Sequence, residues 1–211
     1  RLIAFIGIPN EIAPIETKLE SPVVSRIQGF VFTSGVIDGN GIVAARAGVG
    51  KVNAAIVATL LLDHFAPSAV LFIGTAGAVD RALNPGDVVI GTAVGYHDFG
   101  SITERGLNRS PTRDPVSGQV DPIFFPADPE LLAAARRAVK TVQPSRGPRT
   151  DGEAPKIREG IIATGDAFVS DARSRNDLRT DLNASAVEME GAAVAQVCAR
   201  YHVPFLVIRS I

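Results

Sequence analysis

The stretch KVNAAIVATLLLDHFAPSAVLFIGTAG, residues 51–77, decides the fold class of this chain. Residues 51–65 are typical of a helix, and Pro67 ends it because proline cannot continue the backbone hydrogen bonds. Residues 69–74 (AVLFIG) are apolar throughout, which predicts a fully buried strand running into the glycine-rich turn 74–77. A helix followed at once by a buried strand is the repeating unit of α/β proteins, so we predict that class.

The same alternation of strands and helices continues on both sides of this stretch. We predict further strands at 2–8, 87–98, 157–165, 186–190 and 204–210, and a hairpin of 30–37 with 42–47 around Asp38-Gly39-Asn40-Gly41. We predict further helices at 11–20 with Asn10 as N-cap, at 128–142, at 173–182 and from about Gly191. Residues 99–126 and 144–156 are predicted to be loops without regular structure. We therefore expect one layered α/β domain over residues 1–211, built on a mostly parallel sheet.

The composition is ordinary for a globular protein and excludes several functional classes. The chain has 21 basic and 22 acidic residues, a formal net charge of −1, so no nucleic-acid or membrane partner is expected. No apolar run reaches the about 18 residues of a membrane span. Cys198 is the single cysteine, and His64, His97 and His202 lie far apart, so we expect no metal site. Low cysteine use fits a cytoplasmic protein, which we expect, and equally a chain that has lost an export signal.

The candidate ligand site follows from the order of the predicted strands. In open α/β sheets, ligands bind outside the carboxyl ends of the strands. Polar or glycine-rich residues occur at five such ends: Gly7–Glu11, Gly74–Gly77, Gly165-Asp166, Glu188–Glu190 and Arg209-Ser210.

Two glycine-rich segments invite nucleotide-binding interpretations that the spacing rejects. Gly48-Val49-Gly50-Lys51 resembles part of a P-loop, but Val52 stands where the pattern needs Ser or Thr, and position 45 is alanine instead of glycine. Gly74-Thr75-Ala76-Gly77 does not match the dinucleotide-binding fingerprint, and an acidic ribose partner is missing at the usual distance.

Glu188 and Glu190 place two carboxylates around Met189, the only methionine. If 186–190 is a strand, Glu190 lies at its carboxyl end beside the N-terminus of the next helix. Both glutamates could then simply complement the helix dipole, as Glu11 could in its own first turn. Arg209 could equally be a buried ion-pair partner.

A set of motifs, taken in their order along the chain, gives these residues a further interpretation. GVGKVNAA, GTAGAVD, NPGDVVIGTAVGYHD, TGDAF, VEMEGAAVAQVC and VPFLVIRSI together resemble the nucleoside phosphorylase superfamily, most closely its methylthioadenosine/S-adenosylhomocysteine nucleosidases. The resemblance spans nearly the whole chain. It implies a three-layer α/β domain whose central mixed, mostly parallel sheet is flanked by helices. It also implies cleavage of the N-glycosidic bond of a purine nucleoside, with no cofactor.

The resemblance assigns the substrate contacts residue by residue. Glu190 would hold the ribose hydroxyls and place negative charge near the developing sugar cation. Met189 would pack against the sugar, Phe168 would stack on the purine, and the backbone of Val169 would contact the purine edge. The rest of the implied substrate-binding set is Val49, for the 5′ substituent, with Thr75, Ala76, Gly77 and Glu188.

The implied catalytic residues are Glu11, Glu190 and Arg209. Glu11 would be the general base that activates water, helped by Thr75 and Arg209. The aspartate that protonates the departing purine is expected directly after Ile211, so we expect this chain to lack a C-terminal segment. The segment after Asp98 differs from the usual loop of the family, which leaves the identity of the 5′ group open.

Hydrolysis and phosphorolysis can be weighed from charge. A phosphorylase must bind a phosphate dianion, typically with arginines close to the glycine-rich loops, yet the residues directly before Gly74 are Leu71, Phe72 and Ile73. Glu11 near Gly7 would repel an anion by about 4 kcal/mol per unit charge at 4 Å near a surface. We therefore expect a nucleosidase. A phosphate-dependent phosphorylase and a non-catalytic nucleoside-binding protein of the same fold are the alternatives. By resemblance we also expect a homodimer.

Overall fold

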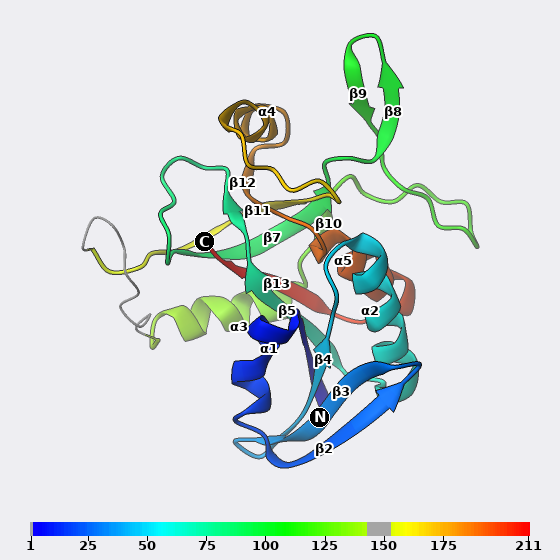
Figure 1. Ribbon diagram of the computed structural model, residues 1–211, viewed down its shortest axis with the longest axis vertical. Coiled ribbons are helices and arrows are strands. Elements are labelled where there is room, and N and C mark those ends of the chain that lie inside the picture. The colour runs from blue at the N-terminus through cyan, green and yellow to red at the C-terminus, as the bar shows by residue number, and fades with distance from the viewer. Residues whose placement is uncertain (1, 143–152) are drawn as a thin grey trace.

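The computed structural model describes residues 2–142 and 153–211, in which one large sheet is flanked by helices (Figure 1). The helices are α1 (Pro9–Glu16), α2 (Lys51–Phe65), α3 (Pro129–Val139), α4 (Ala172–Leu182) and α5 (Gly191–Tyr201). The strands of the large sheet are β1 (Leu2–Gly7), β2 (Glu20–Ile27), β3 (Phe30–Ile37), β4 (Asn40–Arg46), β5 (Ala69–Thr75), β6 (Gly77–Ala78), β7 (Val88–Tyr96), β10 (Phe125–Pro126), β11 (Ile157–Thr164), β12 (Ala184–Glu188) and β13 (Phe205–Ser210). A separate hairpin is formed by β8 (Gly100–Thr103) and β9 (Gly106–Arg109).

The sheet is mixed and mostly parallel in its centre, as predicted. Its strand order is β2-β3-β4-β1-β5-β13-β7-β11-β12-β6, with β10 pairing on β7. Within the described part of the chain, five of the six neighbouring pairs from β4 to β12 are parallel, and only β13 with β7 is antiparallel. The parallel strands are linked by helices, because a parallel connection must cross from one end of the sheet to the other.

Side chains alternate between two helical layers on the faces of this sheet. Along β13, Phe205 and Val207 pack into the large core that contains residues of α2 and α5. Their neighbour Leu206 packs into a second core, where side chains of α3 cover the opposite face together with Ile208. This period of two is the geometry of a strand buried on both faces. Figure 1 shows α2 and α5 on one side of the sheet and α3 on the other, which gives the three layers.

The two-residue strand β6 brings distant strand ends together. It follows β5 after a single residue, yet pairs antiparallel with β12, with Gly77 opposite Val187 and Ala78 opposite Ala186. The chain leaving β5 therefore closes onto the far part of the sheet. As a result the carboxyl ends of β5 and β12, which are four strands apart in the sheet order, meet at one place.

Several element predictions need correction. Helix α1 begins at Pro9 with Ile8 as its N-cap, so Asn10 is not the cap, and the helix ends at Glu16 instead of residue 20. Proline is well suited to the first helical position, where its missing N–H is not needed. The following β2 was not predicted, because most of its side chains are exposed and it contains Pro22, which is typical of an edge strand.

The region 99–126 is also more regular than predicted. It contains the β8–β9 hairpin, whose turn has Gly106 at φ +101°, and the short strand β10. The hairpin lacks an apolar face, since most of its side chains are exposed, and so it gives no hydrophobic period in the sequence. Helix α3 ends at Val139, with Asp128 as its N-cap. The loop predicted at 144–156 lies mostly outside the described residues.

Within residues 2–142 and 153–211, no helix is both long enough and apolar enough to cross a lipid bilayer.

Candidate active site

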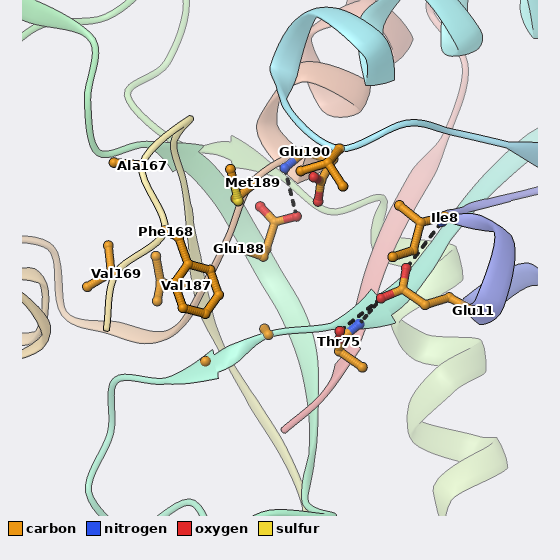
Figure 2. Close-up of a pocket in the computed structure, with 13 residues that line it drawn as sticks. Ile8, Glu11, Thr75, Ala167, Phe168, Val169, Val187, Glu188, Met189 and Glu190 are labelled. Carbon is orange, nitrogen blue, oxygen red and sulfur yellow. Dashed lines mark hydrogen bonds between the residues drawn. The ribbon is translucent and has the colours of Figure 1, made fainter. Parts of the chain in front are cut away.

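A pocket of about 420 Å³ lies where the ends of β1, β5, β11 and β12 meet. All of the site residues predicted from the sequence line it except Arg209, which is buried behind it. The full lining is Ile8, Glu11, Val49, Thr75, Ala76, Gly77, Ala167, Phe168, Val169, Val187, Glu188, Met189 and Glu190. Ala167 and Val187 were not predicted, and each directly precedes a predicted residue, whereas Ile8 belongs to the predicted strand end Gly7–Glu11. Figure 2 shows Glu11 and Thr75 on one side of the pocket and Phe168 on the other, with Glu188 to Glu190 between them.

Glu11 is held in place by the start of helix α1. As the third residue of that helix, it reaches back so that its Oε2 accepts a hydrogen bond of 3.2 Å from the Ile8 N–H. This is the reciprocal half of a capping box. Its other oxygen, Oε1, accepts from the Thr75 N–H at 2.8 Å and from the Thr75 hydroxyl at 2.9 Å. The carboxylate is thereby fixed at the pocket wall by two separate elements.

Gly74 allows Glu11 and Arg209 to approach the same point at the end of β5. A Cβ atom on Gly74 would overlap Arg209 Nη1 and would lie 2.5 Å from Glu11 Oε2. Any side chain here would therefore displace one or both groups. Arg209 itself is 1% exposed and lies over the Phe72 ring, 4.1 Å from its centroid, in a cation–π contact.

Glu188 lines the pocket, but both of its carboxylate oxygens accept hydrogen bonds from other groups of the protein. It accepts hydrogen bonds from the Glu190 and Gly191 N–H groups at the start of α5, from the Thr164 hydroxyl and from Arg209. A carboxylate at a helix N-terminus is favoured by the free N–H groups there. The Glu188–Arg209 pair is thus a buried ion pair that fixes the wall of the pocket, and Glu190 is the carboxylate that remains for a ligand.

Glu190 lies at the N-cap of α5 and is 7% exposed. Its Oε1 accepts a hydrogen bond of 2.8 Å from the Gly50 N–H, and its Oε2 is 3.8 Å from Arg209 Nη2. Burial raises the pKa of the Glu190 carboxyl above its ordinary value, with the nearby Glu188 adding to the rise and the Gly50 and Arg209 contacts opposing it. A buried acceptor of this kind suits a ligand hydroxyl, which can donate to it.

Phe168 provides an open aromatic surface at the pocket edge. Its side chain follows the end of β11, and the residue is 82% exposed. The ring stands at the edge of a pocket lined mainly by apolar side chains, an arrangement on which a flat ring could stack. In the residues that the structure describes, no group of three or more His, Cys, Asp or Glu side chains is arranged to hold a metal ion.

Comparisons with known proteins agree with this geometry. A family model described as "Phosphorylase superfamily" matches residues 1–211. The chain is 39% identical over 213 residues to the 5′-methylthioadenosine/S-adenosylhomocysteine nucleosidase of Bacillus cytotoxicus, covering 99% of this chain and 84% of that protein.

Solved structures are similar over the whole length of the chain. The structure of the same type of nucleosidase from Neisseria meningitidis, in complex with methylthio-immucillin-A, superposes with a TM-score of 0.82 at 33% identity, covering 99% of this chain and 84% of that chain. A mutant of futalosine hydrolase from Helicobacter pylori gives a TM-score of 0.82 at 30% identity, covering 100% of this chain and 89% of that chain.

Proposed function

The chain belongs to the phosphorylase superfamily, and from that premise we propose that it hydrolyses the N-glycosidic bond of 5′-substituted adenosines of the methylthioadenosine or S-adenosylhomocysteine type. One observation carries the proposal. A single pocket presents an exposed aromatic ring, a buried carboxylate and a threonine-bound carboxylate on separate walls, as Phe168, Glu190 and Glu11. These three groups match the base, the ribose and the attacking water of such a reaction.

The proposed reaction replaces the bond from C1′ to the purine nitrogen by a bond from C1′ to a water oxygen. The bonding electrons leave with the purine, and positive charge develops on the sugar. Glu190 accepts hydrogen bonds from the ribose hydroxyls and stabilises this charge, with Met189 packed against the sugar. Glu11 takes a proton from the attacking water. The departing purine takes up a proton at a ring nitrogen, so the products are a neutral free base and a free sugar.

The charge around Glu11 favours water over phosphate as the nucleophile. The described residues that line the pocket include Glu11, Glu188 and Glu190 but no lysine or arginine. Arg209 is the nearby cation, and it is already paired with Glu188 behind the wall. A phosphate dianion beside Glu11 would meet a repulsion of about 4 kcal/mol for each of its two charges at 4 Å, whereas water would gain a hydrogen bond.

Three further assignments belong to the proposal. Residues 1–211 act as one domain because a single sheet runs from β1 to β13. A homodimer is supported by the exposed apolar side chains Val49, Val52 and Ile56, which lie on and just before α2. Light scattering of the full-length protein in solution tests the dimer. We also propose a cytoplasmic location, with which the single cysteine is compatible.

A substrate panel tests the proposed function. The full-length protein is incubated with methylthioadenosine, S-adenosylhomocysteine, adenosine, inosine and futalosine, and the base and sugar products are followed by chromatography. We expect free adenine and free sugar from the 5′-substituted adenosines, and slower release from adenosine. Binding of these nucleosides without any release of base would contradict the proposed hydrolase activity. It would favour a nucleoside-binding protein without catalytic activity.

A further inference from the structure

Lys51, the lysine of the GVGK segment, forms ion pairs within the protein and does not face a phosphate site. Lys51 begins helix α2, and its ammonium donates to both oxygens of Asp98 at 2.8 Å each. The same ammonium lies 3.5 Å from Asp166 Oδ2. With two carboxylates in contact, this ammonium is already neutralised by the protein itself.

Backbone hydrogen bonds close the same group of residues into a ring of contacts. The Lys51 N–H donates to Asp166 Oδ1 at 2.8 Å, and the Asp166 N–H donates to Asp98 Oδ2 at 2.8 Å. We call Lys51, Asp98 and Asp166 the clasp. Its members follow β4, β7 and β11, so the clasp ties together three chain segments that leave the sheet at separate strands.

Each end of the clasp adjoins a wall of the pocket. Asp166 precedes Phe168 by two residues, and both lie in the segment that follows β11. Lys51 directly follows Gly50, whose N–H holds the Glu190 carboxylate at 2.8 Å. The clasp therefore links the segment that carries the aromatic wall to the segment that holds the buried carboxylate.

We propose that Lys51 is a positioning residue that sets the purine-stacking wall at Phe168 relative to the ribose carboxylate Glu190; the inference rests on the proposed function. An isolated exposed ion pair would have little effect of this kind, because solvent screens it and the side chains are free to move. Here the Lys51 and Asp98 side chains are only 23% and 24% exposed, and backbone hydrogen bonds hold both aspartates.

The ionisation of the Asp98 carboxyl is consistent with a lasting ion pair between Asp98 and Lys51. Burial raises the pKa of its carboxyl, but the hydrogen bonds from Lys51 and from the Asp166 N–H lower it by more, so the pKa lies below its ordinary value. Asp98 is therefore ionised at neutral pH and able to hold Lys51.

The test uses a tryptophan reporter, since the chain contains no tryptophan. Phe168→Trp places a single indole on the wall whose position is in question. Lys51→Met is then introduced, which keeps the apolar stem and removes the ammonium, and Lys18→Met is the matched control at an exposed lysine. The fluorescence anisotropy of the introduced indole is measured without substrate, because the 82% exposed position is open to solvent in any case and only its freedom to move is in question. We expect clearly lower anisotropy in Lys51→Met and no change in Lys18→Met.

Steady-state kinetics give the second measurement, in protein that keeps the natural Phe168 and carries no tryptophan reporter. Because a displaced wall weakens binding of the base, we expect Lys51→Met to raise KM for the nucleoside about tenfold, with kcat changed far less. Asp166→Asn should act in the same direction and serves if Lys51→Met does not fold. Unchanged anisotropy together with an unchanged KM would overturn the proposal, whatever happens to Tm. If the wild-type protein cleaves no nucleoside, the proposed function fails, and the anisotropy measurement still decides whether the clasp positions Phe168.

Discussion

Glu11 and Glu190 are carboxylates of the same pocket with different surroundings. Glu11 is half-buried and bound by Thr75 and by the start of α1. Glu190 is buried, receives one hydrogen bond from Gly50 and has a raised pKa. A carboxylate that faces water and is held rigidly suits proton removal, whereas a buried one suits charge stabilisation.

Replacing Glu11 tests its role as the base. Glu11→Gln keeps the size of the side chain but cannot take a proton from water. We expect kcat to fall by about 10²–10⁴ with KM nearly unchanged, because general-base catalysis contributes on that order. Steady-state kinetics measure this, with Glu20→Gln at an exposed position as control. A Glu11→Gln enzyme with wild-type kcat would show that another group activates the water.

The raised pKa of Glu190 predicts how stability depends on pH. A carboxyl whose pKa is higher in the folded state stabilises the fold below the unfolded value of about 4.5, and this contribution is lost as pH rises through the raised pKa. The ionised Glu190 should therefore destabilise the fold at neutral pH. We expect Glu190→Gln to raise Tm at pH 7, with a difference that shrinks toward pH 4, while activity falls.

Thermal melts of both proteins from pH 4 to pH 8 measure this difference. A lower Tm of Glu190→Gln at pH 7 would mean that the Gly50 and Arg209 contacts outweigh burial. The acidic limb of the pH profile of kcat/KM is an independent readout. It should lie above the range of an ordinary carboxylate, because Glu190 must be ionised to stabilise the cation.

Glu11, Thr75, Glu190 and Arg209 could be predicted because each lies near the end of a strand whose apolar pattern is plain in the sequence. Val49, Phe168 and Val169 were predicted only from the resemblance to the family. The roles of Glu188 and Glu190 could not be separated in this way. Both belong to VEMEG, and only the coordinates show that Glu188 is satisfied by Thr164, Arg209 and the α5 N-terminus. Hydrogen bonds between residues distant in sequence leave no local signal.

At the scale of elements, the end of β5 is the place where close packing limits the sequence most. Gly74 lies between Arg209 of β13 and Glu11 of α1. We expect Gly74→Ala to lower kcat at least about 10²-fold, because a displacement of about 1 Å in a catalytic group has that effect. Kinetics and a thermal melt of this variant would be compared with wild type. Full activity in Gly74→Ala would show that the strand end can move aside without disturbing Glu11.

The elements that sequence analysis missed are those without a buried face. Strands β2, β8 and β9 have mostly exposed side chains, so neither alternation nor an apolar run marks them. Strand β6 is only two residues long, and its pairing with β12 depends on how the whole sheet closes. By contrast, β5, β7 and β13 were predicted because burial on both faces demands apolar residues throughout.

At the scale of the whole molecule, Cys198 reports on the layer formed by α2 and α5. It is fully buried in the large core, and burial raises the pKa of its thiol to about 12. At pH 8 only about one thiol in 10⁴ would then be ionised, so a thiol reagent should react with the folded protein extremely slowly. We expect full reaction only in denaturant, with a midpoint that coincides with loss of helical circular dichroism.

Fast labelling of Cys198 under native conditions would contradict this packing. It would show that the α2 and α5 layer opens without global unfolding.

The closure of the sheet through β6 is what turns separate strand ends into one pocket, and the central claim is that this pocket carries out hydrolysis. The most direct test is base release from methylthioadenosine by the full-length protein, in phosphate-free buffer and in saturating phosphate, with the sugar product identified. The account predicts equal rates and free methylthioribose in both buffers. Release that requires phosphate and yields the sugar 1-phosphate would contradict it.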